Sequence, residues 1–299
     1  MASPNWTRLI RFIARETGRI HIGQPTNAQI DVGLAMLSKQ PLTAHEISGT
    51  SALDASQVTD NVLTVDRLLE PIAREQIGIL RCLGLNYTDH AAEAKMPIPP
   101  IPNLFYKPIT TVIPPGAPIV IPRVAQPVEE HVPDYEVELA IVIGKAARDV
   151  PEDKALEYVL GYTAGNDVSF RKYQLAISQW GFSKSFDNTT PIGPCLVSTR
   201  QILDPQNLSL KTTLNGKVLQ DGTTANQIFN VKQTVSFLSQ GTTLLPGAII
   251  ITGTPKGVGF VRDPPILLRH GDDLRIFVGG GIGTLVSPVI EEKTPASKI

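Results

Sequence analysis

The chain is poor in cysteine and has no long apolar run. Its 299 residues include only two cysteines, Cys82 and Cys195, which lie far apart and form no CxxC motif. This pattern favours two free thiols in a reducing compartment over a disulfide framework or a zinc site. No run of about 18 apolar residues occurs, and the N-terminus lacks the apolar stretch of a signal peptide. We therefore expect neither a membrane span nor a signal peptide.

The charges are nearly balanced. The sequence has 27 Lys and Arg against 28 Asp and Glu, for a formal net charge of −1. Without a basic excess to neutralise phosphates, nucleic acid is not an expected partner. We predict a cytoplasmic protein, and the last three residues, Ser297, Lys298 and Ile299, add a second hypothesis. They differ at one position from the S-K-L peroxisomal address, although so short a match arises easily by chance.

Hydrophobic residues make up 42% of the chain, enough for one large domain or for a small and a larger one. Residues 7–14 alternate between apolar and polar and are soon followed by IHIGQ, which predicts a β-hairpin with Gly18 in its turn. A helix-like pattern lies around residues 61–69. We assign residues 1–72 to a small N-terminal domain and residues 73–299 to a larger second domain.

The second domain is rich in short strands. Alternation and β-branched content predict strands at residues 79–83, 135–144, 208–214, 248–252, 274–278 and 284–289. Asn215-Gly216 predicts a hairpin turn, and Pro151 opens a short helix at residues 152–159. Few helices, 24 Gly and 25 Pro predict a mostly-β fold of the α+β type.

Glu136 and Glu138 form the first chemical constellation. On a strand, residues two apart project to the same face, so the two carboxylates point together. Like charges this close raise each other's pKa unless a cation lies between them. A solvated strand face would explain an isolated Glu-x-Glu. However, Ala140 and Val142 continue the same face and are apolar, so this face does not resemble an open surface.

Asp167 lies at the end of a predicted strand, in the turn Gly165-Asn166-Asp167. Taken alone, it is better explained as a helix N-cap. Together with Glu136 and Glu138 it supplies a third hard oxygen ligand. A carboxylate set without sulfur or imidazole selects Mg²⁺, Mn²⁺ or Ca²⁺ over Zn²⁺. Because such a site leaves room for water and a chelating substrate, Mg²⁺ is the preferred prediction.

His90 and Glu93 form a second constellation. Their spacing of three puts them side by side on a helical turn. A carboxylate beside an imidazole raises its basicity and fixes its orientation, as general acid–base catalysis requires. An exposed pair on a surface helix explains the spacing equally well. The proline-rich stretch that follows, residues 97–102, makes this turn a candidate lid hinge.

Three further segments add candidate residues. Arg171 and Gln174 share a helix face that suits a planar carboxylate. Lys184 lies between aromatic residues, where partial desolvation would let it stabilise a developing negative charge, although a single lysine is usually exposed. Thr254 lies in the turn TGTPKG, which offers a hydroxyl and backbone N–H groups to a carboxylate. This turn lacks the GxxxxGK[ST] spacing of a phosphate loop.

Seven stretches together resemble the fumarylacetoacetate hydrolase superfamily. The resemblance is strongest to the subgroup that contains fumarylacetoacetate hydrolase domain-containing protein 2 and its fungal relatives. In chain order the stretches read LGLNYTDHAAE, DYEVELAIVIGK, GYTAGNDVSFRKYQ, KSFDNTTPIGP, LNGKVLQ, LLPGAIIITGTPKGVG and HGDDL. Each is weak alone, but their shared order from Leu83 to Leu274 makes the combination specific. Residues 1–72 carry much less of the signal.

The resemblance implies a mixed β-sandwich roll with a small N-terminal domain and a catalytic second domain. It also implies a homodimer and a bound Mg²⁺, with Mn²⁺ or Ca²⁺ as alternatives. Mapped by motif, the implied metal ligands are Glu136, Glu138 and Asp167; the catalytic residues are His90, Glu93 and Lys184; and the substrate-binding residues are Arg171, Gln174 and Thr254.

The resemblance further implies an enzyme that acts on a small 2-oxo acid through a metal-stabilised enolate. The subgroup favours oxaloacetate tautomerase or decarboxylase activity. The intact His90–Glu93 pair keeps open the hydrolysis of a C–C bond in an acylpyruvate or a fumarylacetoacetate-like diketo acid. The alternative of another class is a non-catalytic protein that binds a metal or an oxo acid. Such a protein is expected to have lost a ligand or a base, and this chain has lost none.

Overall fold

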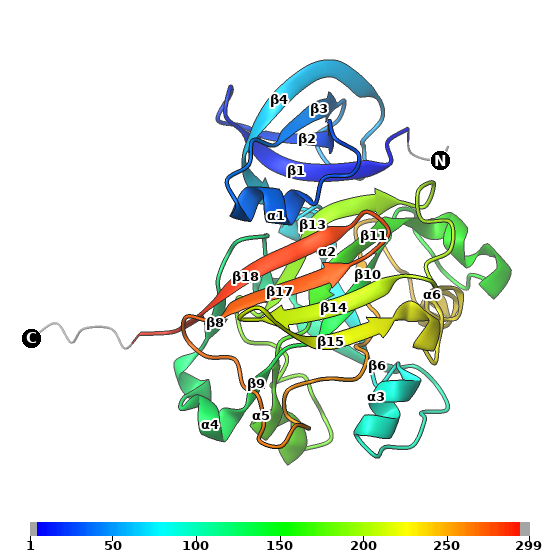
Figure 1. Cartoon of the computed structure of the whole chain (residues 1–299). Coiled ribbons are helices and arrows are strands. Elements are labelled where there is room, and N and C mark those ends of the chain that lie inside the picture. Colours follow the sequence, from blue (N-terminus) through cyan, green and yellow to red (C-terminus); the bar gives the residue numbers. More distant parts are fainter. Residues whose placement is uncertain (1–4, 294–299) are drawn as a thin grey trace, which may run out of the picture.

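The computed structural model describes residues 5–293 (Figure 1). Strands dominate it, in an 11-stranded, a five-stranded and a two-stranded sheet, so the mostly-β prediction is confirmed. Within the described range, no helix is long and apolar enough to cross a membrane. The predicted peroxisomal address, Ser297, Lys298 and Ile299, lies outside the described residues.

The largest sheet combines N-terminal and C-terminal strands. From edge to edge it runs through β2 (Ile20–Pro25), β3 (Thr43–Ile47), β4 (Val58–Leu69), β1 (Arg8–Ala14), β13 (Thr190–Ser198), β11 (Val159–Asn166), β10 (Val137–Ile143), β16 (Ile249–Ile251), β5 (Ile79–Gly84) and β6 (Asn103–Pro108). The short strand β7 (Val112–Ile113) pairs with β13.

The other two sheets consist of strands from the predicted second domain. The five-stranded sheet has the order β15 (Lys217–Thr223), β14 (Ser209–Leu214), β17 (Asp273–Val278), β18 (Gly283–Glu291) and β8 (Ile119–Ile121). The two-stranded sheet consists of β9 (Pro133–Asp134) and β12 (Ser169–Phe170). The strands of the five-stranded sheet lie in front of β10 and β11 in Figure 1.

The helices are short and connect strands. The α-helices are α1 (Val32–Leu37), α2 (Arg74–Ile77), α3 (Thr88–Glu93), α4 (Val128–His131), α5 (Arg171–Ala176) and α6 (Val231–Ser239). The 3₁₀ helices are η1 (Ile109–Thr111), η2 (Arg123–Ala125), η3 (Glu152–Tyr158) and η4 (Thr224–Asn226). The helix predicted after Pro151 is therefore present, but as the 3₁₀ helix η3.

The N-terminal hairpin is confirmed, and one N-terminal prediction is wrong. Strands β1 and β2 pair antiparallel, and Gly18 in the turn has φ of +64°. The helix predicted around residues 61–69 does not exist, because these residues form most of strand β4. The buried residues Leu63 and Val65 alternate with less buried neighbours, and β4 pairs with both β1 and β3. Pairing with two strands outweighed the local pattern.

The strands predicted in the second domain are all present, at slightly different ends. The Asn215-Gly216 turn joins β14 to β15, and Leu214 pairs with Lys217 across it. Both turn residues have positive φ, 50° for Asn215 and 80° for Gly216. These are the angles that a two-residue hairpin turn requires and that Asn-Gly adopts readily.

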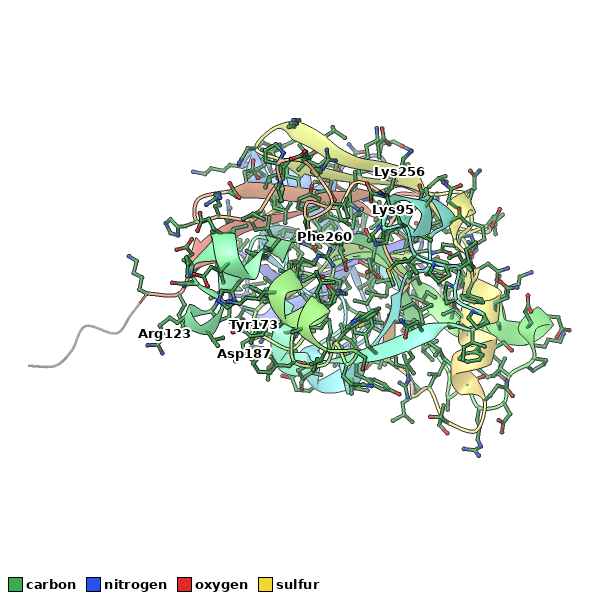
Figure 2. The ribbon with its side chains drawn as sticks, turned by 90° about the horizontal axis from the view of Figure 1, so that it is seen from below. Lys95, Arg123, Tyr173, Asp187, Lys256 and Phe260 are labelled. Atoms are coloured by element: carbon green, nitrogen blue, oxygen red, sulfur yellow. The ribbon has the colours of Figure 1, made fainter. Side chains whose placement is uncertain are left out.

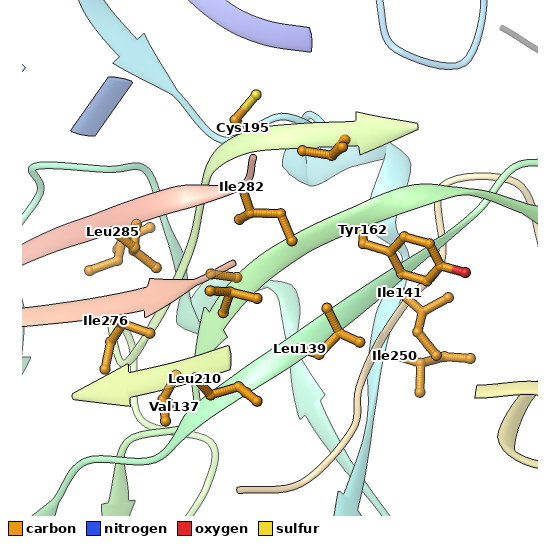
Figure 3. Close-up of a cluster of buried hydrophobic side chains, with 14 of the residues drawn as sticks. Val137, Leu139, Ile141, Tyr162, Cys195, Leu210, Ile250, Ile276, Ile282 and Leu285 are labelled. Carbon is orange, nitrogen blue, oxygen red and sulfur yellow. The ribbon is translucent and has the colours of Figure 1, made fainter. Parts of the chain in front are cut away.

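Successive side chains of strand β10 point alternately to the two faces of the large sheet. Val137, Leu139 and Ile141 enter the core between the large and the five-stranded sheets, beside Leu210 of β14 and Ile276 of β17 (Figure 3). The intervening residues point to the opposite face, where Ala140 and Val142 join a second apolar cluster and are fully buried. The face that carries Glu138 is therefore enclosed, as its apolar continuation predicted.

The two predicted domains are linked by hydrogen bonds. Strand β1 pairs with β13 of the second domain as well as with its N-terminal neighbours. The Asp31 carboxylate caps α1 and also accepts hydrogen bonds from the backbone N–H and the hydroxyl of Thr284 in β18. The boundary after residue 72 falls between β4 and α2, and it remains a prediction.

Candidate active site

Three carboxylates meet where β10 begins and β11 ends. Glu136 directly precedes β10, Glu138 lies within it, and Asp167 directly follows β11. These strands pair antiparallel, and the backbone N–H of Asp167 donates to the carbonyl of Glu136 over 3.0 Å. One oxygen from each carboxylate lies within 4.8 Å of the others, and all three residues are buried. The predicted triad is thus assembled by strand register.

The ammonium groups of two buried lysines contact this triad. The ammonium of Lys184 donates to Glu136, Asp167 and the hydroxyl of Ser169, all within 2.9 Å. The ammonium of Lys107 donates to the other carboxylate oxygen of Asp167 over 2.6 Å. Both lysines are buried. Asp167 therefore binds two ammonium groups through its side chain, an interaction that the N-cap interpretation did not anticipate.

The surroundings shift the pKa values of the two glutamates in opposite directions. Burial raises the pKa of Glu138 well above its ordinary value, and the neighbouring Asp167 and Glu136 raise it further. For Glu136, burial also acts to raise the pKa, but Lys184 and Arg171 outweigh it and lower the pKa below its ordinary value. Among the three carboxyl groups, Glu138 is the one that forms no ion pair in the described structure, although Lys184 lowers its pKa in part. A divalent cation bound by the triad would supply a compensating charge.

Helix α3 carries the predicted acid–base pair. His90 and Glu93 lie side by side, with 3.4 Å between the imidazole Nδ1 and a carboxylate oxygen. Both oxygens of Glu93 accept the backbone N–H of Gly257 over 2.9 Å. Burial raises the pKa of Glu93, but the hydrogen bonds from His90 and Gly257 outweigh it and lower the pKa, so the carboxylate is charged. The pair is not an exposed surface feature, because His90 is buried.

Comparison with known proteins agrees with this geometry. Residues 80–290 match the domain family described as Fumarylacetoacetate (FAA) hydrolase C-terminal. The chain belongs to the fumarylacetoacetate hydrolase family. As a member of this family it is an enzyme, and the alternative of a non-catalytic binding protein is not supported.

Individual relatives differ in their named activities. Caffeoylpyruvate hydrolase of Neonothopanus nambi is 55% identical over 294 residues, 98% of this chain and 96% of that protein. The mitochondrial oxaloacetate tautomerase FAHD2A of Homo sapiens is 36% identical over 224 residues, 74% of this chain and 69% of that protein. The crystal structure of 2-hydroxyhepta-2,4-diene-1,7-dioate isomerase from Mycobacterium marinum has a TM-score of 0.78 at 34% identity, covering 96% and 100% of the chains. The expected family fold is therefore confirmed.

The acidic triad of this family member fits a hard divalent cation. Its donors are carboxylate oxygens, without a thiolate or an imidazole among them. Such donors prefer Mg²⁺, Mn²⁺ or Ca²⁺. The high pKa of Glu138 agrees with this assignment, because a carboxyl group that holds its proton in the metal-free site can exchange it for a cation.

Arg171 and Gln174 lie on one face of α5, as predicted, but much of Arg171 is engaged within the protein. Its guanidinium contacts Asp134 over 2.7 Å and Glu136 over 2.7 Å, and it donates to the side-chain oxygen of Gln174 over 2.7 Å. It also stacks on the ring of Phe260, 4.5 Å from the ring centroid. These contacts make Arg171 a link between the triad and the loop that carries Phe260.

Thr254 is presented to the site by Gln220, which ends the stretch LNGKVLQ but received no role in the sequence analysis. The side-chain N–H group of Gln220 donates to the Thr254 hydroxyl oxygen over 2.8 Å and to the carbonyl of Pro255 over 2.9 Å. The Gln220 oxygen accepts from the Thr212 hydroxyl and the backbone N–H of Val137. Since the Thr254 oxygen acts as an acceptor here, its hydrogen stays available to donate.

The loop with Thr254 continues past α3. Figure 2 labels Lys256 and Phe260 on this loop, and it shows Lys95, just after α3, on the same side of the molecule as Lys256. The bond between Gly257 and Glu93 joins the two segments directly. The loop thus connects the acid–base pair to the region around Arg171.

Two other residues of the site escaped the sequence analysis. Lys107 lies on β6, where its alternation with Phe105 predicts an inward side chain, but a single lysine between Tyr106 and Pro108 gives no motif. Asp134 is fully buried and accepts hydrogen bonds from Arg171 and from the backbone N–H groups at residues 135, 259 and 260. Asp134 opens the family stretch DYEVELAIVIGK, just before the Glu-x-Glu strand, but the sequence analysis gave it no role.

Proposed function

We propose that this enzyme is a divalent-metal-dependent hydrolase that cleaves the C–C bond of an acylpyruvate. The likeness to caffeoylpyruvate hydrolase, which extends over 98% of the chain, supports this substrate class. The structural observation that carries the proposal is the His90–Glu93 pair, which is held in place by Gly257. Hydrolysis needs a positioned base to activate water, and this pair supplies one.

Glu136, Glu138 and Asp167 would hold the cation, which we propose to be Mg²⁺, with Mn²⁺ or Ca²⁺ as alternatives. When bound, the cation supplies Lewis acidity at the 2-oxo carboxylate end of the substrate. Lys184 has three acceptors for its three ammonium hydrogens, so its contacts favour a role in orienting the carboxylates. That role would act on catalysis through the metal ligands.

The acid–base pair performs the proton transfers. His90 takes a proton from water, and the water oxygen bonds to the acyl carbonyl carbon. The bond from that carbon to the methylene group then breaks, its electron pair stays on the methylene carbon, and this carbon takes the proton from His90. The products are a carboxylic acid and pyruvate, with one water consumed. Glu93 orients the imidazole and stabilises its charged form.

Thr254 and Gln174 are the proposed substrate contacts. The Thr254 hydroxyl can donate to a substrate oxygen, because its own oxygen already accepts from Gln220. Gln174 is only partly buried, and its side-chain N–H group is suited to a substrate carboxylate. Arg171 would contribute chiefly by fixing Gln174 and Glu136 in place.

A second candidate function is oxaloacetate tautomerisation. Relatives named as oxaloacetate tautomerases share 36–38% identity with this chain. The same pair of residues would move a proton between the methylene carbon and the neighbouring oxygen, and no water would be consumed. A decarboxylase of oxaloacetate would likewise need no activated water.

The decisive experiment is a substrate screen with caffeoylpyruvate, acetylpyruvate, fumarylpyruvate and oxaloacetate, each with Mg²⁺ or with EDTA. Pyruvate release is followed with lactate dehydrogenase, and oxaloacetate tautomerisation by ultraviolet absorbance. We expect metal-dependent pyruvate release from an acylpyruvate. His90→Ala should lower kcat by about 10²–10⁴-fold with little change in KM. Conversion of oxaloacetate alone would favour the second candidate, and full turnover in EDTA would contradict metal dependence.

We also propose that the enzyme is a homodimer located in the cytoplasm. The support for the homodimer is the family resemblance alone. Size-exclusion chromatography with light scattering should give twice the 32.3 kDa of one chain. A mass equal to one chain at micromolar concentration would contradict it.

A further inference from the structure

A cavity of about 1020 Å³ lies between the N-terminal strands and the second domain. Its walls include Met36 and Leu37 of α1 on one side and Val286 and Pro288 of β18 on the other. None of the triad, the acid–base pair or the proposed substrate contacts lines it. Cavities of this size at the junction of two domains commonly bind small molecules.

The cavity is part of the fold, because its two walls are fixed to each other. Asp31, at the start of α1, accepts from the Thr284 backbone over 3.1 Å and from its hydroxyl over 2.6 Å. Next to it, a Cβ atom at Gly33 would lie 1.7 Å from the Thr284 carbonyl oxygen, so no side chain fits there. Figure 1 shows the resulting close approach of α1 to β18.

The lining is mostly apolar, although it opens to solvent. Ile20 and Leu37 are 51% and 45% exposed, and both line the cavity. Met36, Val286 and Pro288 extend this apolar surface. Large apolar side chains that stay accessible within a concave surface are typical of a ligand site.

Most acidic side chains of the lining already have partners. Glu70 lies 4.0 Å from Arg11 and 3.5 Å from Arg74. Asp272 accepts from the Asn215 side chain and from a backbone N–H, and Asp273 forms an ion pair with Arg275. The remaining acid, Glu75, is exposed. The lining therefore has little capacity left to bind a cation.

The arginines of the cavity lining have N–H donors that are not used in ion pairs. Arg11, Arg67 and Arg74 all line the cavity, and each guanidinium carries five N–H donors. Two of them share the single carboxylate of Glu70. Arg67 is exposed and forms no ion pair with another side chain in the range 5–293. An anion at this rim would be met by guanidinium groups.

We propose that the cavity binds a small amphipathic carboxylate. The apolar body of the ligand lies on the surface formed by α1 and β18, and its carboxylate faces Arg67 and Arg74. This site is separate from the metal centre, so the proposal does not depend on the function proposed above.

The test uses two probes on the full chain, with Mg²⁺ and pyruvate present to occupy the catalytic centre. 8-Anilinonaphthalene-1-sulfonate should bind saturably at one site per chain, with a rise in fluorescence. Octanoate should displace it, and 1-octanol of the same length should displace it far less, because only octanoate carries the anion.

Variants then locate the site. Arg67→Ala removes a side chain without a carboxylate partner and should weaken octanoate binding by about 10-fold. Leu37→Glu introduces a negative charge into the apolar surface and should abolish binding. Arg15→Ala is the matched control, because Arg15 is an exposed arginine just after β1 that does not line the cavity. It should bind octanoate like the unmodified chain.

Three results would overturn the proposal: equal displacement by octanoate and 1-octanol, unchanged binding in both Arg67→Ala and Leu37→Glu, or no saturable probe binding. Sedimentation velocity is run in parallel. If Leu37→Glu converts a dimer into monomers and the unmodified dimer binds no octanoate, the cavity is an interface between two copies of the chain instead.

Discussion

At the scale of single residues, the centre depends on buried charges that compensate one another. The Lys107 ammonium has no exposed surface, and it forms an ion pair with Asp167, a residue 60 positions away along the chain. Without Lys107, Asp167 would keep its contact with Lys184, but the buried cluster would carry one more uncompensated negative charge, which costs far more than an exposed pair gains. Lys107 is thus a positioning residue for one of the metal ligands.

We expect Lys107→Met to lower the free energy of unfolding of the metal-free protein by about 3 kcal/mol. Saturating Mg²⁺ should stabilise this variant more than the unmodified protein, because the ion replaces the missing positive charge. Urea denaturation in EDTA and in Mg²⁺ measures both effects. Lys172→Met is the control, since Lys172 forms an exposed ion pair with Glu130 and should change little in either condition.

The raised pKa of Glu138 predicts a pH dependence. Above pH 4.5, the ordinary value, an unfolded chain has released this proton while the folded, metal-free protein still holds it. The stability of the metal-free protein should therefore fall as pH rises from 4.5 through the raised pKa, by at most about 1.4 kcal/mol per pH unit from this group.

Glu138→Gln isolates that contribution, because Gln resembles the protonated carboxyl group at every pH. The difference in unfolding free energy between the two metal-free proteins should change with pH in the stated direction. Denaturation curves in EDTA across this range measure it. Parallel pH profiles for the two proteins would show that Glu138 does not hold a proton in the folded state.

At the scale of secondary-structure elements, a loop holds α3 in place. The helix has only six residues, too short to be stable alone. Both Glu93 oxygens accept the Gly257 N–H, and Gly257 has φ of +103°. A Cβ atom there would lie 2.4 Å from the Leu219 carbonyl oxygen. The loop can therefore bind Glu93 only with glycine at this position.

Gly257→Ala should therefore displace the loop and release Glu93. We expect kcat with the preferred substrate to fall about 10-fold or more, since the imidazole loses its orienting partner, while the Mg²⁺ affinity measured by calorimetry stays unchanged. Gly241→Ala is a matched control, because Gly241 also has positive φ but has open space around its Cβ position. Equal loss of kcat in both variants would point to general backbone strain.

At the scale of the whole molecule, the N-terminal strands are attached to the second domain through the β1–β13 pairing and the Asp31 contacts. Asp31→Ala removes a helix cap and leaves the Thr284 N–H without its acceptor. We expect the free energy of unfolding to fall by about 2–4 kcal/mol with little change in kcat. Asp54→Ala is the control, because the Asp54 carboxylate bonds only within its own loop. A loss confined to kcat would contradict this purely structural role.

Sequence alone determined those parts of this protein that rest on local periodicity or on short-range motifs. Alternation at Val137, Leu139 and Ile141 predicted a buried strand, and with it two carboxylates on one face. The spacing of His90 and Glu93 predicted their contact. Asn215-Gly216 predicted a hairpin, because its backbone angles are intrinsic to those residues. Asp167 was predicted as a third metal ligand because it could act together with the two glutamates and because the family resemblance implied it.

Only the tertiary structure decided what depends on contacts between distant segments. Residues 61–69 became a strand because two neighbouring strands paired with them, against their own helix-like pattern. Lys107 lay in no motif, and Gln220 received no role although it ends the stretch LNGKVLQ, since their roles arise from partners 60 and 34 positions away, Asp167 and Thr254. Hydrogen bonds and ion pairs of this kind form only after the sheets have packed. Such contacts therefore cannot be predicted from a pattern of nearby residues. Strand alternation and turn geometry depend on only a few neighbouring residues, so the sequence predicts them.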